Sequence, residues 1–330
     1  MSFTFLHVAD VHLGFRAYDK TEAVSKFNLR ENDVYTAWQE FIRYARNNPV
    51  DAVLIAGDLF DSNTPQPAAY AMANALRTLA CPCIIIMGNH ERPTINSISP
   101  IEVLHGDNVF CYTEPGIHQI GDISIYCAPD IGSPYDFEPA DILLTHGQLD
   151  GPPEYRYTTE RLVFIADQYL YCALGDLHYH WQRKNIQYPG NLTSLTFGTE
   201  GKQFGFIHGK ISSTDAVETT LVPVFARDFI TLDMRDKKAW ERPFDEFSNA
   251  IVRIQTVDSS HEEIEKIRQA VAEHAVHVKV VRYPVEQERK VVTIQGSTLR
   301  EEYIDFCNKK DREHLVIRGL KVLGGNLTEI

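Results

Sequence analysis

The stretch "FTFLHVADVHLG", residues Phe3–Gly14, joins an apolar run to a carboxylate and an imidazole. The apolar residues predict a buried β-strand that ends near Val8. Asp10 and His12 follow two residues apart, so their side chains point the same way if the chain stays extended. A carboxylate beside an imidazole is a common start to a metal site, whereas an isolated D-x-H pair is more often a solvated strand end. The rest of the chain decides between these two interpretations.

The composition sets limits on the kind of protein. The chain has 330 residues and a formal net charge of −13. This charge argues against a protein that grips polyanions with a basic surface, although bound cations or a basic partner can supply positive charge. No apolar run is long enough to span a membrane, and His7 and Asp10 interrupt the N-terminal hydrophobic stretch, which argues against a signal peptide. We therefore expect a cytoplasmic protein with no membrane anchor. The six cysteines form no C-x-x-C pair, which predicts buried free thiols.

Short apolar runs alternate with helical patterns through the first two thirds of the chain, which predicts a layered α/β architecture. We expect strands over residues 3–9, 51–57, 82–88, 122–128, 141–146 and 168–175, and helices over residues 31–48 and 68–80. A charged, Pro-containing stretch then places a domain boundary near residue 235. Beyond it we expect a β-α-β unit over residues 249–257, 261–274 and 276–285, followed by helices over residues 297–310 and 311–323.

Other expected strand ends repeat the pattern of the first. They carry Asp58 in "GDLFD", Asn89 and His90 in "GNHE", His146 in "THG", and Asp176 and His178 in "GDLH". Ligands gather at the carboxyl ends of strands in open α/β sheets, so these polar residues should meet at one rim. Carboxylates, an amide oxygen and imidazoles together suit Mn²⁺, Fe²⁺ or Zn²⁺ and not an organic cofactor.

The ordered set "DVH", "GDLFD", "GNHE", "THG" and "GDLH" resembles the calcineurin-like metallophosphoesterases. Within that superfamily, "HVADVHLGFRAYD", "LIAGDLFDSNTPQP" and "YPGNLTSLTFGTEGKQFGF" resemble the nuclease subunit of the SbcC and SbcD type of double-strand-break repair complex. The resemblance implies an α/β fold, a layered metallophosphoesterase β-sandwich flanked by helices, for a nuclease domain over residues 1–235. It also implies a smaller α+β C-terminal cap domain over residues 236–330 that positions DNA.

The same resemblance implies two divalent metal ions, with Mn²⁺ expected first and Mg²⁺ or Fe²⁺ as alternatives. One ion would be held by Asp10, His12, Asp58 and His178, and the other by Asp58, Asn89, His146 and Asp176. His90 would be catalytic and not a ligand, because its imidazolium could stabilise the transition state or protonate the leaving oxygen. Relatives have G-H-x-H where this chain has "GDLH". Either Asp176 is a ligand in place of that imidazole, or the second metal is weakened; His180 is an alternative ligand.

These features predict a Mn²⁺-dependent DNA exonuclease and endonuclease that acts in double-strand-break repair or recombination. Its expected partners are DNA, an SMC-like ATPase of the SbcC type and a second copy of the chain, in a homodimer. One alternative is a phosphodiesterase or phosphatase on a small molecule, since one metal core serves many substrates. Another is a non-catalytic scaffold. The expected cap favours the nuclease over the first alternative, and the intact ligand set with His90 argues against the second.

Overall fold

The computed structural model describes residues 2–129, 137–147, 166–212, 216–236, 243–257 and 259–283, all within a compact unit that spans Met1–Tyr283. Two six-stranded sheets form most of it. The first has the spatial order β12 (Val217–Pro223), β11 (Gly205–Ile211), β1 (Phe3–Val8), β2 (Ala52–Ala56), β3 (Cys83–Ile86) and β4 (Val109–Tyr112). The second has the order β5 (Gly116–Ile120), β6 (Ile123–Ala128), β7 (Ile142–His146), β8 (Tyr171–Gly175), β10 (Ile186–Tyr188) and β9 (Trp181–Arg183).

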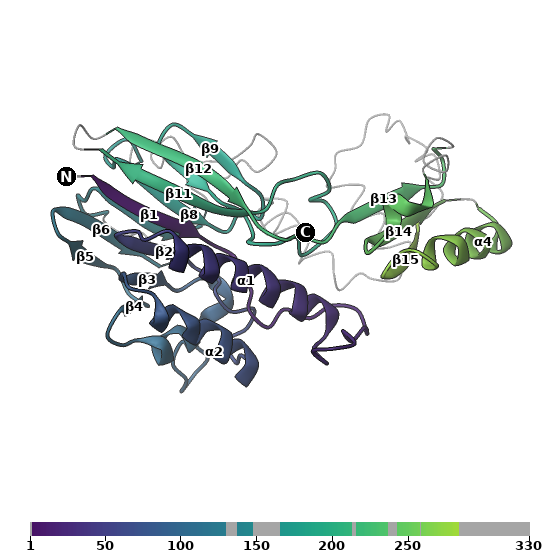
Figure 1. The fold of residues 1–330 in the computed structure, drawn as a ribbon, viewed down its shortest axis with the longest axis horizontal. Helices are drawn as coiled ribbons and strands as arrows, with labels where there is room; N and C mark the ends of the chain where they lie inside the picture. Colours follow the sequence, from purple (N-terminus) through teal and green to yellow (C-terminus); the bar gives the residue numbers. More distant parts are fainter. Residues whose placement is uncertain are drawn as a thin grey trace, which may run out of the picture. The chain divides into compact units, whose positions relative to one another are not determined.

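The two sheets pack face to face as a β-sandwich (Figure 1). Phe5 and Leu54 of the first sheet and Ile142 and Tyr171 of the second belong to one buried cluster between them. β1 to β4 run parallel, as do β6, β7, β8 and β10, so the carboxyl ends of the central strands in each sheet point one way. Strands covered on both faces are apolar throughout, which is why the sequence revealed them so clearly.

Helices cover the outer face of the first sheet (Figure 1). α1 (Leu29–Asn47) buries Trp38 and Phe41 against that sheet, and Asn28 caps its first turn by accepting from the Arg30 backbone N–H at 3.0 Å. The helix expected over residues 68–80 is instead α2 (Pro67–Ala73) followed by the 3₁₀ turn η1 (Asn74–Thr78). Three further 3₁₀ turns are described: η2 (Asn89–Glu91), η3 (Pro100–Leu104) and η6 (Phe244–Phe247).

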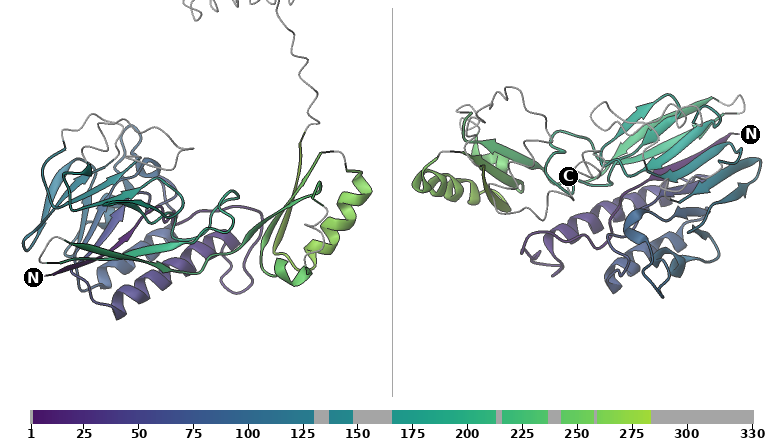
Figure 2. Two further views of the ribbon diagram at one scale, coloured as in Figure 1. Left: turned by 90° about the horizontal axis from the view of Figure 1, so that it is seen from above. Right: turned by 180° about the vertical axis from the view of Figure 1, so that it is seen from behind.

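A third, parallel sheet contains β13 (Phe229–Asp233), β14 (Ile251–Thr256) and β15 (His277–Arg282). α4 (His261–Ala272) connects β14 to β15 and packs on this sheet through buried Val271 (Figure 2). The expected β-α-β unit is therefore confirmed, as is the α/β fold with a smaller α+β part. β13 pairs with β14 although it precedes residue 235, and the domain boundary there stays a prediction.

Two sequence-based expectations concern features beyond the sheets. The helices expected over residues 297–323 lie outside the described residues. Where the structure describes the chain, none of its helices combines the length and the apolar character needed to cross a bilayer.

Candidate metal centre

The polar residues after the central strands come together at one rim of the sandwich. Three groups of side chains have ligand atoms within 4.8 Å of one another: Asp10, His12 and His178; Asp10, Asp58 and His146; and His12, Asp61 and His90. They come from loops that follow β1, β2, β3 and β8 and from the end of β7. The convergence that the strand ends predicted is therefore present, while the assignment of each residue as a ligand stays a prediction.

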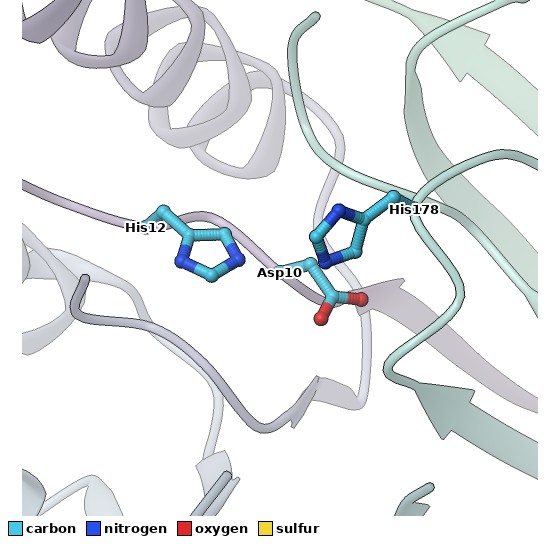
Figure 3. A group of neighbouring side chains, drawn as sticks. All are labelled: Asp10, His12 and His178. Carbon is cyan, nitrogen blue, oxygen red and sulfur yellow. The ribbon is translucent and has the colours of Figure 1, made fainter. Parts of the chain in front are cut away.

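The first group joins the loop after β1 to the loop after β8. Figure 3 shows Asp10, His12 and His178 around a common space. Burial, and next the charge of Asp58, raise the pKa of Asp10 well above its usual value. Burial, and next His12, lower the pKa of His178 to about 4. The raised pKa of Asp10 disfavours its carboxylate, and the lowered pKa of His178 disfavours its imidazolium. A divalent cation would favour the ionised carboxylate and the neutral imidazole, which are the forms that bind metals.

The second group brings hydrogen-bond acceptors together. His146 Nδ1 lies 2.8 Å from the Ala56 carbonyl oxygen, which can only accept, so Nδ1 carries the proton. In the neutral ring, Nε2 is then an acceptor. It faces Asn89 Oδ1 at 2.9 Å and Asp58 Oδ2 at 3.6 Å. Three acceptors that converge without a donor fit a cation, and their oxygen and nitrogen chemistry suits a divalent transition metal.

His12 provides an independent sign of a ligand site. Its side chain is 3% exposed, and neither ring nitrogen has a well-aligned hydrogen-bond partner among the described residues. Nδ1 lies 3.2 Å from the Asp61 carboxylate, and Nε2 lies 3.9 Å from Asp58. A carboxylate behind one ring nitrogen is the usual arrangement for a histidine that ligates through the other. Sequence reasoning missed Asp61, although the second Asp of "GDLFD" was the available signal.

His90 is held at the same rim but is more open to solvent, with 40% of its side chain exposed. Its backbone N–H donates to Asp58 Oδ1 at 3.0 Å, and its Nδ1 lies 2.9 Å from the Asp61 carbonyl oxygen. The carbonyl fixes the proton of a neutral ring on Nδ1, so Nε2 is the nitrogen left for other contacts, 4.0 Å from Asp58. This ring also belongs to a group with His12 and Asp61, and its catalytic role stays a prediction.

Glu91 is a second residue that sequence reasoning left without a role. Its carboxylate is fully buried and accepts the backbone N–H groups of Phe60 and Gly88, each at 2.9 Å. These contacts hold the loop after β2 against the loop after β3. Burial, and next the charge of Asp58, raise the pKa of Glu91 to about 8. Glu91 therefore positions the backbone that carries Asp58 and Asn89.

The backbone at the rim is strained. Asp10, His12, Asp58 and Asp176 all have left-handed φ angles, of 49°, 53°, 49° and 88° respectively. Such conformations cost about 1–3 kcal/mol each in non-glycine residues and cluster at functional sites. Hydrogen bonds between the loops hold them, including His12 N–H to the Asp58 carbonyl oxygen at 3.0 Å. Three of these four residues, Asp10, His12 and Asp58, belong to the groups that share the common space.

Close packing also explains two glycines in the motifs, Gly57 and Gly88. A Cβ at Gly88 would lie 2.2 Å from Asp58 Oδ1. Any side chain there would push the Asp58 carboxylate out of its place. Gly57, with φ of 81°, is similarly pressed against the His146 ring, where a Cβ would lie 2.4 Å from Nδ1.

Asp176 contacts the rim through its backbone. Its backbone N–H donates to both oxygens of Asp10 at 3.1 Å, but its carboxylate belongs to none of the three groups found in the described residues. Its assignment as a ligand of the second ion stays a prediction. The alternative ligand His180 directs Nδ1 to the Tyr188 carbonyl oxygen at 3.0 Å and likewise belongs to none of these described groups.

Comparison with known proteins places this rim in a family. The chain is 23% identical over 349 residues to the "DNA double-strand break repair protein Mre11" of Methanocaldococcus jannaschii, covering 96% of this chain and 88% of that protein. The protein of the same name from Haloferax volcanii is 25% identical over 303 residues, covering 87% of this chain and 62% of that one. The one from Sulfurisphaera tokodaii is 33% identical over 128 residues, so the similarity spans 37% of this chain and only 31% of that protein.

A model of the calcineurin-like phosphoesterase family matches residues 3–178, more than half of the chain and the segment that supplies every residue of the three groups. The chain therefore belongs to the calcineurin-like phosphoesterase family.

Proposed function

We propose that this protein is a metal-dependent DNA nuclease, with exonuclease and endonuclease activity, that acts in double-strand-break repair or recombination. The observation that carries the proposal is the extent of the similarity to the M. jannaschii protein. It covers 96% of the chain and so continues past residue 178, where the general family match ends, into the region of the third sheet. A phosphoesterase on small molecules would share the metal rim but would have no reason to share that additional part.

The proposal assigns the metal-holding residues as the family pattern suggests. One ion would be bound by Asp10, His12, Asp58 and His178, and the other by Asp58, Asn89, His146 and Asp176. Mn²⁺ is the proposed metal, because the donor set mixes imidazole with carboxylate and amide oxygens. When bound, two such ions supply Lewis-acid polarisation of a phosphodiester and a nucleophilic water at neutral pH.

The protein's own groups would orient the substrate and move the proton. The Asp61 carbonyl oxygen holds His90 Nδ1, so the His90 ring can turn only Nε2 toward a bound phosphate. In the imidazolium form, Nε2 holds a proton that it can donate to the departing oxygen. Because His90 is partly exposed at the rim, it can reach a substrate that is too large to enter the buried groups.

A cavity lined by the segment that follows His12 in the sequence supports a polynucleotide substrate. It has a volume of about 520 Å³, and Arg16, Tyr18, Lys20 and Lys26 are among its lining residues. The first of its lining residues, Arg16, lies four residues after His12 in the sequence. The Tyr18 ring packs on His277 of β15 with 4.2 Å between ring centroids. Basic side chains next to an aromatic ring suit a phosphate backbone with its bases. The third sheet would help to position DNA there.

The proposal extends to the cellular context. The expected partner is an SMC-like ATPase of the SbcC type, because the relatives are named for double-strand-break repair. A homodimer and a cytoplasmic location complete the proposal. Sedimentation of the purified chain tests the dimer directly, and co-purification with the ATPase tests the partnership.

The decisive experiment compares two substrates under the same conditions. The full chain is incubated with linear, hairpin and single-stranded DNA, and separately with a chromogenic phosphodiester, in Mn²⁺, Mg²⁺ or excess chelator. We expect DNA cleavage in Mn²⁺ that disappears with chelator, while the circular dichroism spectrum is retained because the sandwich is packed independently of the rim. Turnover of the small substrate without any DNA cleavage would instead favour the small-molecule phosphodiesterase. Cleavage that persists in chelator would reject the metal-dependent assignment.

A further inference from the structure

Arg16 is a solvent-exposed arginine in the segment that follows β1, four residues after His12. Its guanidinium Nε lies 3.1 Å from Glu31 Oε2. The Arg16 side chain is 58% exposed, whereas that of Glu31 is only 3% exposed. The other carboxylate oxygen of Glu31 accepts the Tyr35 hydroxyl at 2.9 Å, so the anion is also held from the side of the helix. A buried carboxylate thus holds one edge of an exposed guanidinium.

The segment that carries Arg16 is fixed on the first turn of α1. Asn28, the residue before that helix, accepts the Ala17 backbone N–H at 3.4 Å and donates to the Tyr18 carbonyl oxygen at 2.7 Å. Glu31 belongs to the same helical turn, so these contacts bring the arginine and its carboxylate partner together. The guanidinium therefore extends from a backbone that is itself held in place.

The ion pair orients the guanidinium more than it stabilises the fold. Ion pairs with an exposed partner contribute little to stability, whereas burial of a carboxylate carries a desolvation penalty. Glu31 engages Arg16 Nε, so the two Nη groups remain for a second acceptor. A planar guanidinium held along one edge presents its other edge to an anion, and phosphate oxygens match this fork of donors.

The surroundings of Arg16 are positive within an acidic protein. Arg16 lines the cavity of about 520 Å³ together with Lys20 and Lys26, and the acidic member among the described lining residues is Asp19. Three basic groups and one carboxylate therefore share this cavity, although the whole chain has a formal net charge of −13. The local charge favours an anionic ligand.

Arg16 is also close to the rim along the chain. Four extended residues span at most about 14 Å, and the bond from the Phe15 N–H to the His12 carbonyl oxygen, at 2.9 Å, turns the chain and shortens that span. A strand of duplex DNA advances about 3.4 Å per nucleotide. A strand whose phosphodiester is held at the rim would therefore bring another phosphate, only a few nucleotides away, within reach of Arg16. A small phosphodiester has no such second phosphate.

We propose that Arg16 is a specificity-determining residue that binds a flanking phosphate of the DNA strand, and that Glu31 is the positioning residue that holds the guanidinium for this contact. The inference rests on the proposed nuclease function and deepens it, because it identifies a contact that a polynucleotide makes and a small phosphodiester does not. Such phosphate contacts fix the position of DNA without reading its sequence.

The first test is the salt dependence of DNA binding. Fluorescence anisotropy of a labelled DNA duplex is measured with the full chain in excess chelator, so that no cleavage occurs. Arg16→Met should reduce the slope of log K against log [salt] by about 0.9, the value for one phosphate contact, and should weaken binding about tenfold at low salt. Arg16→Lys should keep the slope, because it keeps the charge, but not the full affinity, because it loses the fork of donors.

Arg43→Met is the matched control for this measurement. Arg43 is likewise an exposed arginine that pairs with a glutamate of α1, at 3.9 Å from Glu40, but it lies in the second half of that helix and does not line the cavity. We expect its salt slope and affinity to equal those of the wild type. A slope that falls equally in Arg43→Met and Arg16→Met would reduce the effect to general charge and overturn the proposal.

The second test separates positioning by Glu31 from a structural role. Glu31→Gln should weaken DNA binding when Arg16 is present, because the carboxylate acts through the guanidinium. In the Arg16→Met background the same change removes only a negative charge and should not weaken binding further. An equal loss of affinity in both backgrounds would overturn the positioning role.

The third test uses turnover in Mn²⁺. In Arg16→Met, the ratio of the KM for DNA to the KM for a chromogenic phosphodiester should rise about tenfold, and this ratio decides if DNA binding proves to need Mn²⁺. A wild type that neither binds nor cleaves DNA would reject the proposed function and this inference with it. If it binds DNA without cleaving it, the salt slope decides. A wild type that cleaves DNA, with the salt slope and the KM ratio unchanged in Arg16→Met, would overturn the inference alone.

Discussion

Replacing Asp33 by Asn should destabilise the protein more than removing the charge of Arg227, one of the two partners of Asp33. The Asp33 carboxylate is 1% exposed and is shared by two guanidinium groups. Arg227 donates from Nε and Nη2 at 2.7 Å each, and Arg30, which is fully buried, donates from Nη1. Arg227 also donates to the Asn249 carbonyl oxygen at 2.7 Å, so this cluster connects α1 to the segment before β14.

The magnitude follows from which charges are left without a partner. In Asp33→Asn, the buried Arg30 guanidinium and the partly buried Arg227 guanidinium lose their shared anion, and removal of one partner from a buried ion pair costs about 3–5 kcal/mol. Arg227→Met leaves the buried Arg30–Asp33 pair intact and removes hydrogen bonds that involve charge, worth about 1.5–3 kcal/mol. The first variant should therefore lose more stability than the second. The loss of stability in the double variant should be smaller than the sum of the losses in the two single variants.

The assay is urea denaturation at neutral pH, followed by circular dichroism, with equal m-values required for the comparison. Arg268→Met is the matched control, because its partner Glu265 lies on the exposed face of α4 and the pair is open to solvent. The control should leave the free energy of unfolding unchanged. An Asp33→Asn variant that is no less stable than Arg227→Met would refute the argument from uncompensated buried charge.

Further predictions concern the rim and one buried histidine. His90→Ala should reduce turnover by about 10²–10⁴-fold with metal content unchanged, and a lost ion on metal analysis would make His90 a ligand instead. Asp61→Ala should weaken metal binding by about 10–100-fold in a metal titration, because it removes the carboxylate behind His12; unchanged affinity would count against that orienting role. Asp176→Ala should lose one of two ions and nearly all cleavage, whereas Asp176→His should keep both ions with a changed preference between Mn²⁺ and Mg²⁺. Two retained ions with normal cleavage in Asp176→Ala would end its assignment as a ligand. Burial lowers the pKa of His7 to about 3, so its contribution to stability is complete above pH ~6.5 and is lost as the pH falls toward 3. His7→Asn should therefore flatten the fall of the unfolding free energy between pH 6 and 4, and an unchanged slope in urea titrations would contradict this.

The sequence predicted the strands and helices whose own residues show a recognisable hydrophobic pattern. β2 and β3 were visible because strands covered on both faces are apolar at every position, and β1 departs from this pattern only at Thr4 and His7. The gathering of polar residues at one rim was also predictable, because parallel strands present their carboxyl ends at the same edge. The register between the two sheets was not needed for that inference.

The parts that were missed depend on contacts between distant segments. The helical spacing of residues 68–80 predicts one helix, yet the Asn108 amide binds the carbonyl oxygens of Leu76 and Leu79, and the chain tightens into η1 before it bends. β13 was read as part of a charged linker because it joins its sheet by pairing with β14, which lies beyond η6. A pairing between two strands that are distant in the sequence leaves no periodic pattern in either strand alone.

The residues missed at the rim have the same explanation. Asp61 and Glu91 stand inside motifs that were read correctly, but each acts on a loop other than its own: Asp61 on His12, and Glu91 on the backbone at Phe60. A motif identifies the groups that face the common space, because those groups follow strand ends. It does not identify the groups behind them, whose role depends on how two loops meet.

The electrostatics of the rim indicate why these supporting contacts are needed. The common space is lined by buried carboxylates, amide oxygen and imidazole acceptors, and the pKa of Asp10 is raised by burial and by Asp58. Groups that repel one another would move apart on flexible loops, yet here left-handed backbone at Asp10 and Asp58 keeps them together. Glu91 and the inter-loop hydrogen bonds hold that backbone from outside the space. The fold therefore maintains an arrangement of polar and acidic groups that is unfavourable by itself and would become favourable with bound cations. This is the physical reason to regard the rim as a candidate metal centre and not as a cluster of polar residues at strand ends.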